Sequence, residues 1–511
     1  MARAEPLAAF WTVCPVMPAP GCDYDTIQEA IDEAGDGDVI RVVGNSTYAE
    51  NLVITKSLTL LGGCANAACT VQAPGIWVTT VDGGGADRTV TISGTIQVAL
   101  DGFVITGGDA THGTYPYQYG GGVGAWYADL ILTRNVITGN VAHTLSGSGY
   151  GGGVSAVGGT IDIIGSQVVN NYATLDTGNG HGGGVYLEQV SGVISDTRIQ
   201  GNAAAEDSQG EGGGINLFNS GPITLSGNTI YGNTAATAAG GSGGGLYIRD
   251  CQVVMQENTI VDNLSGLTGT CSGGGMRVRG TDLRMSQNLV VSNTGSIHGT
   301  GSGGGMMLTS SDVWLDRDGL QANVATFTTT VAQYQADAIY LAGNAALTAT
   351  NVVIVRNGVP GYPGSQGIYS HDTAMDPVTI TLVNSTIVSN VNYGVRCLGS
   401  YSNLVVANSI LWGNGDDVDC TTLDLSYSDV EDGDSGTGVI HQDPQFVDPG
   451  ALDFHLVPGS PCIDVGAGPG TNPLVPDVDW DGDARPIGGG YDIGADEVLL
   501  SVFLPTVLRD Y

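Results

Sequence analysis

Positive charge is scarce in this chain. Lysine and arginine together number 15, against 51 aspartates and glutamates, so the formal net charge is −36, and Lys56 is the only lysine. A protein that binds nucleic acid needs a basic surface to neutralise phosphates, so this composition excludes a nucleic-acid partner. An acidic surface with few lysines suits an extracellular or salt-exposed protein, and it also aids solubility.

Long apolar runs are missing as well. No stretch of 18 consecutive apolar residues occurs, so we predict no membrane-spanning helix. The first residues, MARAEPLAAFW, lack the apolar core of a signal peptide, although ARA matches the small-residue pattern of a signal cleavage site. We therefore expect a mature form of a secreted or cell-surface protein.

No CxxC pair occurs among the nine cysteines, which argues against a zinc or thiol-redox site. Most of the cysteines instead have a near neighbour in sequence. We predict up to four disulfides, joining Cys14 to Cys22, Cys64 to Cys69, Cys251 to Cys271 and Cys397 to Cys420. Cys462 is left free or pairs with a partner. Such a framework is typical of a secreted protein.

Glycine, in contrast, is abundant, with 82 residues in 511, and much of it recurs as a triplet. The triplets begin every 30 or 31 residues, at Gly120, Gly151, Gly182, Gly212, Gly243, Gly273 and Gly303. Asparagines that close short apolar runs keep the same period, at Asn140, Asn171, Asn202, Asn233, Asn263, Asn293 and Asn323. A fixed period of this length indicates a solenoid, in which each repeat packs on the next.

The residues after each triplet alternate between apolar and other types, as in Val185 and Leu187, and this period of two predicts β-strands. Two further β-rich runs complete each repeat. We therefore predict an all-β fold, a right-handed parallel β-helix with three strands and three turns per coil. Residues one period apart then lie above one another, and the glycines and asparagines form two architectural ladders.

The N-terminal part contains TIQEAIDEA, in which Thr26 and Glu29 match a capping box and the apolar residues share one helical face. We expect a helix that caps the open end of the first coil. The sequence divides into five parts. An N-terminal extension (1–22) is followed by a helix cap with the first coils (23–80) and by the β-helix repeats (81–420). An irregular Asp/Gly/Pro-rich C-terminal region (421–497) and a strand-like tail (498–511) complete the chain.

TIQEAIDEAGDGDVIRV followed by glycine-punctuated coils resembles the right-handed parallel β-helix proteins of the pectin-lyase-like superfamily. The triplets and the NTIxxN pattern also resemble the repeats of polymorphic outer-membrane proteins. DPQFVDPGALDFHLVPGSPCIDVG and DVDWDGDARPIGGGYDIGADE resemble the C-terminal region of choice-of-anchor Q proteins. The resemblance implies a secreted, often surface-attached β-helix protein without a settled activity. The end of this sequence, LLSVFLPTVLRDY, departs from that family because it contains no obvious anchor.

Outward-facing positions of the strand after each triplet carry aromatic and basic residues. These candidate glycan contacts are Trp126, Tyr186, Glu188, Phe218, Tyr247, Arg249, Arg277 and Arg279. Aromatic faces stack on sugar rings and arginines bind carboxylates bidentately, so the strip suits a neutral or acidic glycan. The alternative is that exposed strand positions favour such residues for structural reasons alone.

Evidence for catalysis is weaker. His112, His143, His181 and His298 lie near triplets and suit acid–base or metal chemistry, but loop histidines are more often only polar surface residues. Asp282 and Asp312 occupy equivalent places in adjacent coils, as a hydrolase pair would, or they cap turns. A lyase site would use Arg249, Arg279 or Arg284 with Asp250. None of these sets forms a specific motif.

DVDWDGD is the most specific site signal. Asp477, Asp479, Asp481 and Asp483 present oxygens at alternating positions around a glycine, as calcium loops do. Further ligands would come from Asp492 or Asp496. The alternative is a solvated acidic turn.

These observations predict a secreted or cell-surface β-helix that acts as an adhesin, a structural component or a glycan-binding scaffold without catalysis. One alternative is a polysaccharide lyase or glycoside hydrolase that uses the outer strip. Another is a self-assembling fibre subunit, in which SVFLPTV pairs with another copy.

Overall fold

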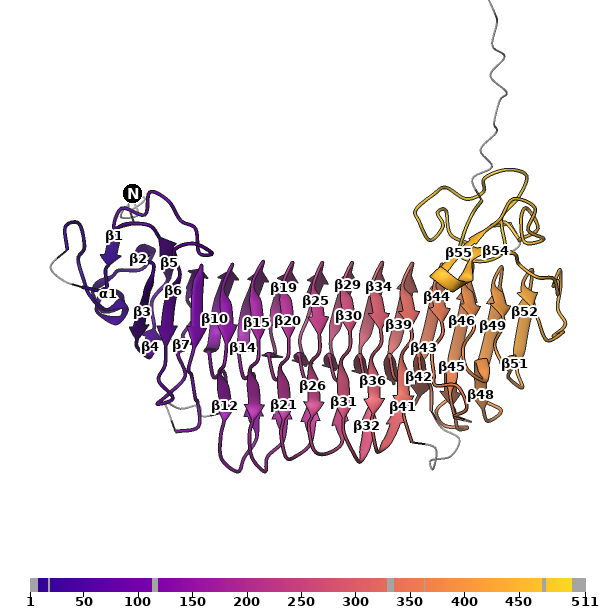
Figure 1. The fold of residues 1–511 in the computed structure, drawn as a ribbon, viewed down its shortest axis with the longest axis horizontal. Coiled ribbons are helices and arrows are strands. Elements are labelled where there is room, and N and C mark those ends of the chain that lie inside the picture. The colour runs from indigo at the N-terminus through magenta and orange to yellow at the C-terminus, as the bar shows by residue number, and fades with distance from the viewer. Residues whose placement is uncertain are drawn as a thin grey trace, which may run out of the picture.

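The computed structural model describes residues 8–16, 19–112, 118–328, 335–362, 364–470 and 475–498. The chain winds into a parallel β-solenoid with its coils stacked along one long axis (Figure 1). The predicted all-β fold is confirmed, since the described residues contain one α-helix, α1 (Ile27–Glu33), and one short 3-10 helix, η1 (Pro449–Ala451). They contain no helix long and apolar enough to cross a membrane.

Sheet 1 has 26 strands in two rows. The first row follows the glycine triplets in the central coils and consists of β4 (Leu52–Ile54), β7 (Val90–Ser93), the first parts of β10 (Val123–Thr133) and β14 (Val154–Ile164), β18 (Val185–Glu188), β23 (Ile215–Phe218), β28 (Leu246–Arg249), β33 (Met276–Arg279), β38 (Met306–Thr309), β42 (Ile339–Ala342), β45 (Gln366–His371), β48 (Tyr393–Leu398) and β51 (Asp416–Asp419).

The second row contains the later parts of β10 and β14, with β1 (Phe10–Val13), β2 (Asp38–Val43), β5 (Leu58–Cys64), β8 (Gln97–Asp101), β19 (Ser191–Ser195), β24 (Ile223–Ser226), β29 (Gln252–Gln256), β34 (Asp282–Ser286), β39 (Asp312–Asp316), β43 (Ala346–Thr350), β46 (Thr379–Val383), β49 (Asn403–Ala407) and β52 (Leu423–Ser426).

Sheet 2 has 14 strands, of which those from β11 to β50 precede the ladder asparagines. They are β3 (Ser46–Ala49), β6 (Thr79–Asp82), β9 (Phe103–Thr106), β11 (Val136–Thr138), β15 (Gln167–Val169), β20 (Arg198–Gln200), β25 (Thr229–Tyr231), β30 (Thr259–Val261), β35 (Leu289–Val291), β40 (Gly319–Gln321), β44 (Val353–Val355), β47 (Thr386–Val388), β50 (Ile410–Trp412) and β53 (Asp429–Val430).

Two smaller sheets complete the central coils. Sheet 3 consists of β12 (Val141–His143), β16 (Tyr172–Thr174), β21 (Ala203–Ala205), β26 (Thr234–Ala236), β31 (Leu264–Gly266), β36 (Thr294–Ser296) and β41 (Val324–Thr326). Sheet 4 lies just before the triplets and consists of β13 (Gly149–Tyr150), β17 (Gly180–His181), β22 (Gly210–Glu211), β27 (Gly241–Ser242), β32 (Thr270–Ser272) and β37 (Thr300–Ser302).

The interior of the solenoid is a set of apolar columns. Val154, Val185 and Ile215 pair in register from coil to coil, and each is fully buried. This pairing confirms that residues one sequence period apart lie over one another.

The glycine triplets form the turn from sheet 4 into sheet 1. The first glycine of a triplet has a left-handed conformation, with φ of +65° at Gly182. A Cβ atom at Gly183 would lie 2.4 Å from the carbonyl carbon of Ala203, and one at Gly184 would lie 2.7 Å from the carbonyl oxygen of Gly214. All three positions therefore exclude a side chain, for conformational or steric reasons.

The asparagines form a buried hydrogen-bonded ladder. At Asn233, Nδ2 donates to Oδ1 of Asn263 and to the carbonyl oxygen of Ile199, while Oδ1 accepts from the backbone of Asn202. A second ladder, which was not predicted from the sequence, runs five residues earlier in each coil through Asn228, Asn258, Asn288 and Asp318.

Helix α1 packs against β1, β2 and β4 at the N-terminal end of the stack, as predicted. Thr26 Oγ1 accepts the backbone N–H of Glu29. The N–H groups of Ile27 and Gln28 are capped by the carboxylate of Glu50, which comes from the loop before β4.

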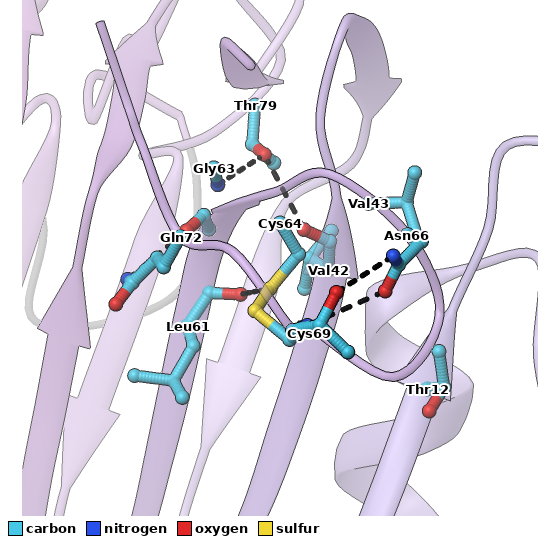
Figure 2. Close-up of a disulfide and its surroundings, with 12 residues drawn as sticks. Thr12, Val42, Val43, Leu61, Gly63, Cys64, Asn66, Cys69, Gln72 and Thr79 are labelled. Carbon is cyan, nitrogen blue, oxygen red and sulfur yellow. Dashed lines mark hydrogen bonds between the residues drawn. A yellow bond between two sulfur atoms is a disulfide. The ribbon is translucent and has the colours of Figure 1, made fainter. Parts of the chain in front are cut away.

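Three of the four predicted disulfides are confirmed: Cys14–Cys22, Cys64–Cys69 and Cys397–Cys420. Figure 2 shows Cys64–Cys69, which closes a short loop after β5. The predicted Cys251–Cys271 bridge is wrong, because Cys251 lies in the turn between β28 and β29 whereas Cys271 lies in β32 of sheet 4, and both thiols are buried and free, as is that of Cys462. Three disulfides indicate a location outside the cytoplasm.

The irregular C-terminal region folds back onto the outer face of sheet 2, above the last coils in Figure 1. Strands β52 and β53 continue the stack beyond Cys420, where the sequence pattern changes. The antiparallel pair β54 (Phe446–Asp448) and β55 (Asp453–Leu456) follows. Except for Val498, the tail 498–511 lies outside the described residues, and with it the strand proposed for fibre assembly.

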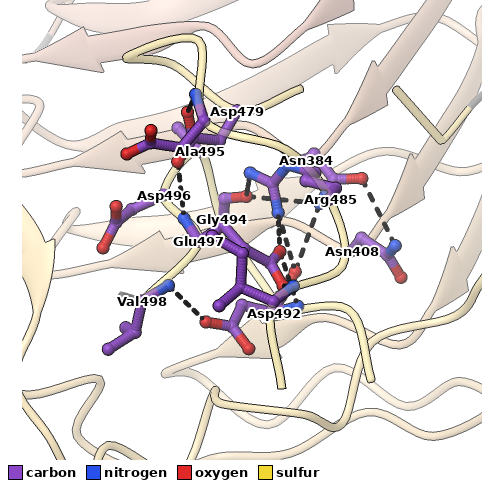
Figure 3. A network of polar contacts seen from close by, with 12 residues as sticks. Asn384, Asn408, Asp479, Arg485, Asp492, Gly494, Ala495, Asp496, Glu497 and Val498 are labelled. Atoms are coloured by element: carbon purple, nitrogen blue, oxygen red, sulfur yellow. Dashed lines mark hydrogen bonds and ion pairs between the residues drawn. The ribbon is translucent and has the colours of Figure 1, made fainter. Parts of the chain in front are cut away.

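A buried ion pair holds this region together (Figure 3). Nη1 of Arg485 lies 2.9 Å from Oε2 of Glu497, and both side chains are fully buried. The polar network continues to the coils, because the Asn384 amide donates to the carbonyl oxygen of Asp492 and the Asn408 amide donates to that of Ala467.

We expect the protein to be more stable at mildly acidic pH. Burial raises the pKa of Asp417 to about 7 and that of Asp429 to about 6. The unfolded chain releases these protons near pH 4, so the contribution is complete below about pH 4 and is lost as the pH rises through about 7. Loss of negative charge from a chain of net charge −36 acts in the same direction.

Calorimetric unfolding at about pH 5.5 and about pH 8, at constant ionic strength, measures this effect. The unfolding temperature is expected to be several degrees higher at the lower pH. An equal or higher value at the upper pH would contradict the assignment of raised pKa values.

Candidate functional site

The predicted outer strip lies in two columns on the first row of sheet 1. The first column contains Tyr186, Asn216, Tyr247 and Arg277, and the second contains Glu188, Phe218, Arg249 and Arg279. Trp126 belongs to the second column, two coils before Glu188. The strand register therefore brings the eight predicted residues onto one face.

The aromatic residues of the strip were expected to expose their ring faces, but three of them are buried. Trp126, Tyr186 and Tyr247 are only 9%, 5% and 6% exposed. The guanidinium of Arg88 lies over the Trp126 ring, 4.9 Å from its centroid. Because a sugar must reach the face of a ring to stack on it, these three residues form the floor beneath the surface.

A third column is formed by the residues directly before the triplets. It runs through Tyr119, Tyr150, His181, Glu211, Ser242, Ser272 and Ser302. The Tyr119 and Tyr150 rings are stacked at 4.5 Å, Tyr150 and His181 at 4.9 Å, and the Tyr186 ring meets Tyr150 edge-on at 5.1 Å. His181 was predicted as a loop histidine that suits acid–base or metal chemistry or is only a polar residue. Neither tyrosine was predicted, although the fixed place of these residues before each triplet is a usable signal.

The ring stack ends at a histidine–carboxylate contact. Nδ1 of His181 lies 3.0 Å from Oε2 of Glu211. Both residues line a polar cavity of about 210 Å³, together with Asn179, Gln209, Gly210, Gly240, Gly241, Ser242, Thr270 and Ser272. Beside it, the Tyr186 hydroxyl donates to Oε2 of Glu188 at 3.0 Å, and burial together with that carboxylate raises the pKa of Tyr186, which therefore remains a donor.

Arginines gather on the next two coils. Arg249 lies over the Phe218 ring at 5.2 Å and pairs with Asp250 at 3.2 Å, and Arg279 is exposed. Arg277 is largely enclosed, its Nη1 is buried without a hydrogen-bond partner among the described residues, and burial lowers its pKa. A buried guanidinium N–H without an acceptor is unfavourable, so this corner suits an anionic ligand.

The predicted catalytic sets are dispersed. His143 is buried, whereas His112 and His298 are exposed. Asp282 and Asp312 pair in register as the first residues of β34 and β39, and both are exposed. Arg284 pairs with Asp282 at 3.8 Å and lies over the Trp314 ring at 4.4 Å.

The DVDWDGD loop is organised around a buried carboxylate. Oδ1 of Asp479 accepts the backbone N–H groups of Asp481, Gly482 and Asp483, and its Oδ2 accepts that of Glu497. Asp479 therefore supports the loop from inside, and the calcium site at Asp477, Asp479, Asp481 and Asp483 stays a prediction.

Two residues were suggested from sequence as extra ligands. Asp492 is buried and accepts the backbone N–H groups of Asp464 and Val498. Asp496 lies with Asp481 and His455 in a group whose ligand atoms are all within 4.8 Å of one another. In the described parts of the chain, no other group of three or more His, Cys, Asp or Glu residues has its ligand atoms this close together.

A family model described as "Right handed beta helix region" matches residues 121–313 and 242–411. A search of curated proteins finds no match. Among solved structures, the chain is similar to the pectate lyase Pel9A, with 13% identity, a TM-score of 0.36 and 97% of each chain covered.

Two further solved structures have similar scores. The A-module of the mannuronan C-5 epimerase AlgE4 of Azotobacter vinelandii has 13% identity and a TM-score of 0.38, with 79% of this chain and 94% of that chain covered. PfbA, a surface adhesin of Streptococcus pneumoniae, has 11% identity and a TM-score of 0.30, with 82% and 92% covered. These similarities carry no conclusion about activity.

Proposed function

This chain belongs to the family of right-handed β-helix proteins, and we propose that it is a secreted or cell-surface protein that binds an extended acidic glycan without cleaving it. The binding surface is the corner between sheet 4 and the first row of sheet 1. It runs along the solenoid axis from the rings of Tyr119 and Tyr150 to Arg249, Arg277 and Arg279.

The observation that carries this proposal is the buried Nη1 of Arg277, which has no hydrogen-bond partner in the described part of the chain. Arg277 lies between Tyr247 and Met307 in its column and is flanked by two further arginines. In a chain of net charge −36, three neighbouring arginines form a local site for carboxylate or sulfate groups. The half-buried rings at the other end suit the apolar faces of sugars.

A location at the cell surface or outside the cell is supported by the three disulfides. The C-terminal motifs that resemble choice-of-anchor Q proteins are consistent with it.

Loss of the exposed arginines should weaken the binding of acidic glycans. The double variant Arg249→Ala with Arg279→Ala is expected to lower the affinity for acidic oligosaccharides by about tenfold or more, because each charge-assisted contact contributes about 1.5 kcal/mol or more. Neutral oligosaccharides should be affected little. A glycan array followed by calorimetry measures both affinities.

Arg198→Ala is the matched control, since Arg198 is an exposed arginine on β20 of sheet 2. It should leave the affinity unchanged. Equal losses in the control and the double variant, or the absence of any acidic ligand, would refute the proposed surface.

Cleavage of the same glycan is a second candidate, favoured by the His181–Glu211 pair in a polar cavity. An imidazole and a carboxylate in contact can transfer a proton to or from a bound sugar. Incubation with pectate, alginate, xylan and host glycans tests it. Release of oligosaccharides that Glu211→Gln abolishes would replace the non-catalytic proposal.

A further inference from the structure

We propose that His455, Asp481 and Asp496 bind a divalent transition-metal ion such as Zn²⁺ on the C-terminal region. The site is separate from the glycan surface, because this region packs on sheet 2 and the proposed glycan surface lies on sheets 1 and 4. The potential ligand atoms of the three residues lie within 4.8 Å of one another.

The imidazole of His455 is oriented as in known metal sites. Strand β55 carries both His455 and Asp453, and Nδ1 of the histidine lies 2.5 Å from Oδ1 of Asp453. A carboxylate on one ring nitrogen fixes the tautomer and leaves the other nitrogen available for a metal. That other nitrogen, Nε2, pairs with Oδ2 of Asp481 at 2.6 Å, so a metal ion would bind between these two atoms in place of the proton that they share.

The two carboxylates are held by the backbone around them. Asp481 follows Trp480, whose N–H donates to the carbonyl oxygen of Ala495, and its own N–H donates to the buried Asp479. Asp496 uses Oδ2 to accept the N–H of Leu456, which leaves its Oδ1 for a ligand. Segments far apart in sequence therefore bring both carboxylates to His455. In Figure 3 the Asp496 carboxylate points away from the Arg485–Glu497 pair.

A small cavity adjoins part of this cluster. It has a volume of about 90 Å³ and is lined by His455 and Asp496 together with apolar groups of Val353, Phe454 and Trp480. Asp481 is not part of this lining. Two of the three proposed ligands therefore border a space in which the exchangeable ligand of an open zinc site would lie.

The donor set also selects the kind of metal. One imidazole nitrogen with two carboxylates suits zinc and neighbouring transition metals, whereas calcium and magnesium prefer oxygen ligands alone. This set differs from the calcium site predicted at residues 477–483 because it includes His455. It shares Asp481 with that loop and Asp496 with the further ligands suggested for it.

Titration of the full chain with Zn²⁺ by calorimetry is expected to show one saturable site, and Co²⁺ should give visible absorption bands when it occupies that site. His455→Gln and Asp481→Asn should abolish both signals. Asp453→Asn should weaken zinc binding by about 10- to 100-fold, since it removes only the support of the imidazole. Circular dichroism of each variant verifies folding.

His298→Gln is the matched control, because His298 is an exposed histidine outside the C-terminal region, and zinc binding should persist in it. Absence of saturable zinc binding, or zinc binding that survives His455→Gln, would overturn the proposal. Calcium binding that persists in His455→Gln, with no zinc site in the unmodified protein, would also overturn it, since the loop would then be an oxygen-only site. None of these results bears on glycan binding.

Discussion

Gly213→Ala is expected to prevent the central coils from stacking. A Cβ atom at Gly213 would lie 2.4 Å from the carbonyl oxygen of Gly244 and 2.4 Å from the carbonyl carbon of Thr234. Both contacts are with backbone, which hydrogen bonds hold in the neighbouring coils, so no side chain can rotate away. We expect a loss of about 4 kcal/mol or more in the free energy of unfolding, or no folded protein.

Gly75→Ala separates this steric effect from the loss of a glycine as such. A Cβ atom at Gly75 would have no neighbour within 4 Å, and the backbone there is not left-handed. Its substitution should change the unfolding free energy by less than about 0.5 kcal/mol. Denaturant unfolding of both variants measures the difference, and similar values for the two would mean that the triplets are not a steric requirement.

Asn233→Ala should be nearly as damaging, for a polar reason. The fully buried amide satisfies the carbonyl oxygen of Ile199 and the backbone N–H and side-chain amide of Asn202. Alanine would remove these contacts and leave the backbone N–H of Asn202 buried without this acceptor, although Nδ2 of Asn202 keeps its bond to the carbonyl oxygen of Val168. Each buried group that loses its partner costs about 1–3 kcal/mol. We expect a destabilisation of about 3–5 kcal/mol, measured by denaturant unfolding.

The matched control is Asn403→Ala, because Asn403 begins β49 and its side chain is exposed. It should be within about 0.5 kcal/mol of the unmodified protein. If Asn233→Ala proved equally mild, the ladder would contribute little to stability and its regularity would need another explanation.

The sequence period was sufficient to predict the solenoid and its register. Val154, Val185 and Ile215 could be placed in one interior column because a ladder needs only equal spacing and alternation. The same alternation placed Phe218 and Arg249 on one outer face. The burial of Tyr186 could not be predicted in this way, because it depends on how the triplet turn brings Tyr119 and Tyr150 against that ring.

Three other features could not be predicted, because no pattern of neighbouring residues in the sequence indicates them. Cys251 and Cys271 are close in sequence, yet the chain path places them in different parts of the coil. An aspartate-rich loop that binds calcium and one that caps its own backbone use similar sequences, so the role of Asp479 required coordinates. His455 is 26 residues from Asp481, and only the fold of the C-terminal region brings them together.

Hydroxyl-radical footprinting with a bound acidic oligosaccharide tests the central claim most directly, namely that the corner between sheets 4 and 1 is the binding surface. If this surface binds the oligosaccharide, oxidation should decrease at Tyr119, Tyr150, His181 and Phe218. It should not change at Tyr231, which is 37% exposed on sheet 2. Protection of Tyr231 without protection of the ring stack would contradict this claim.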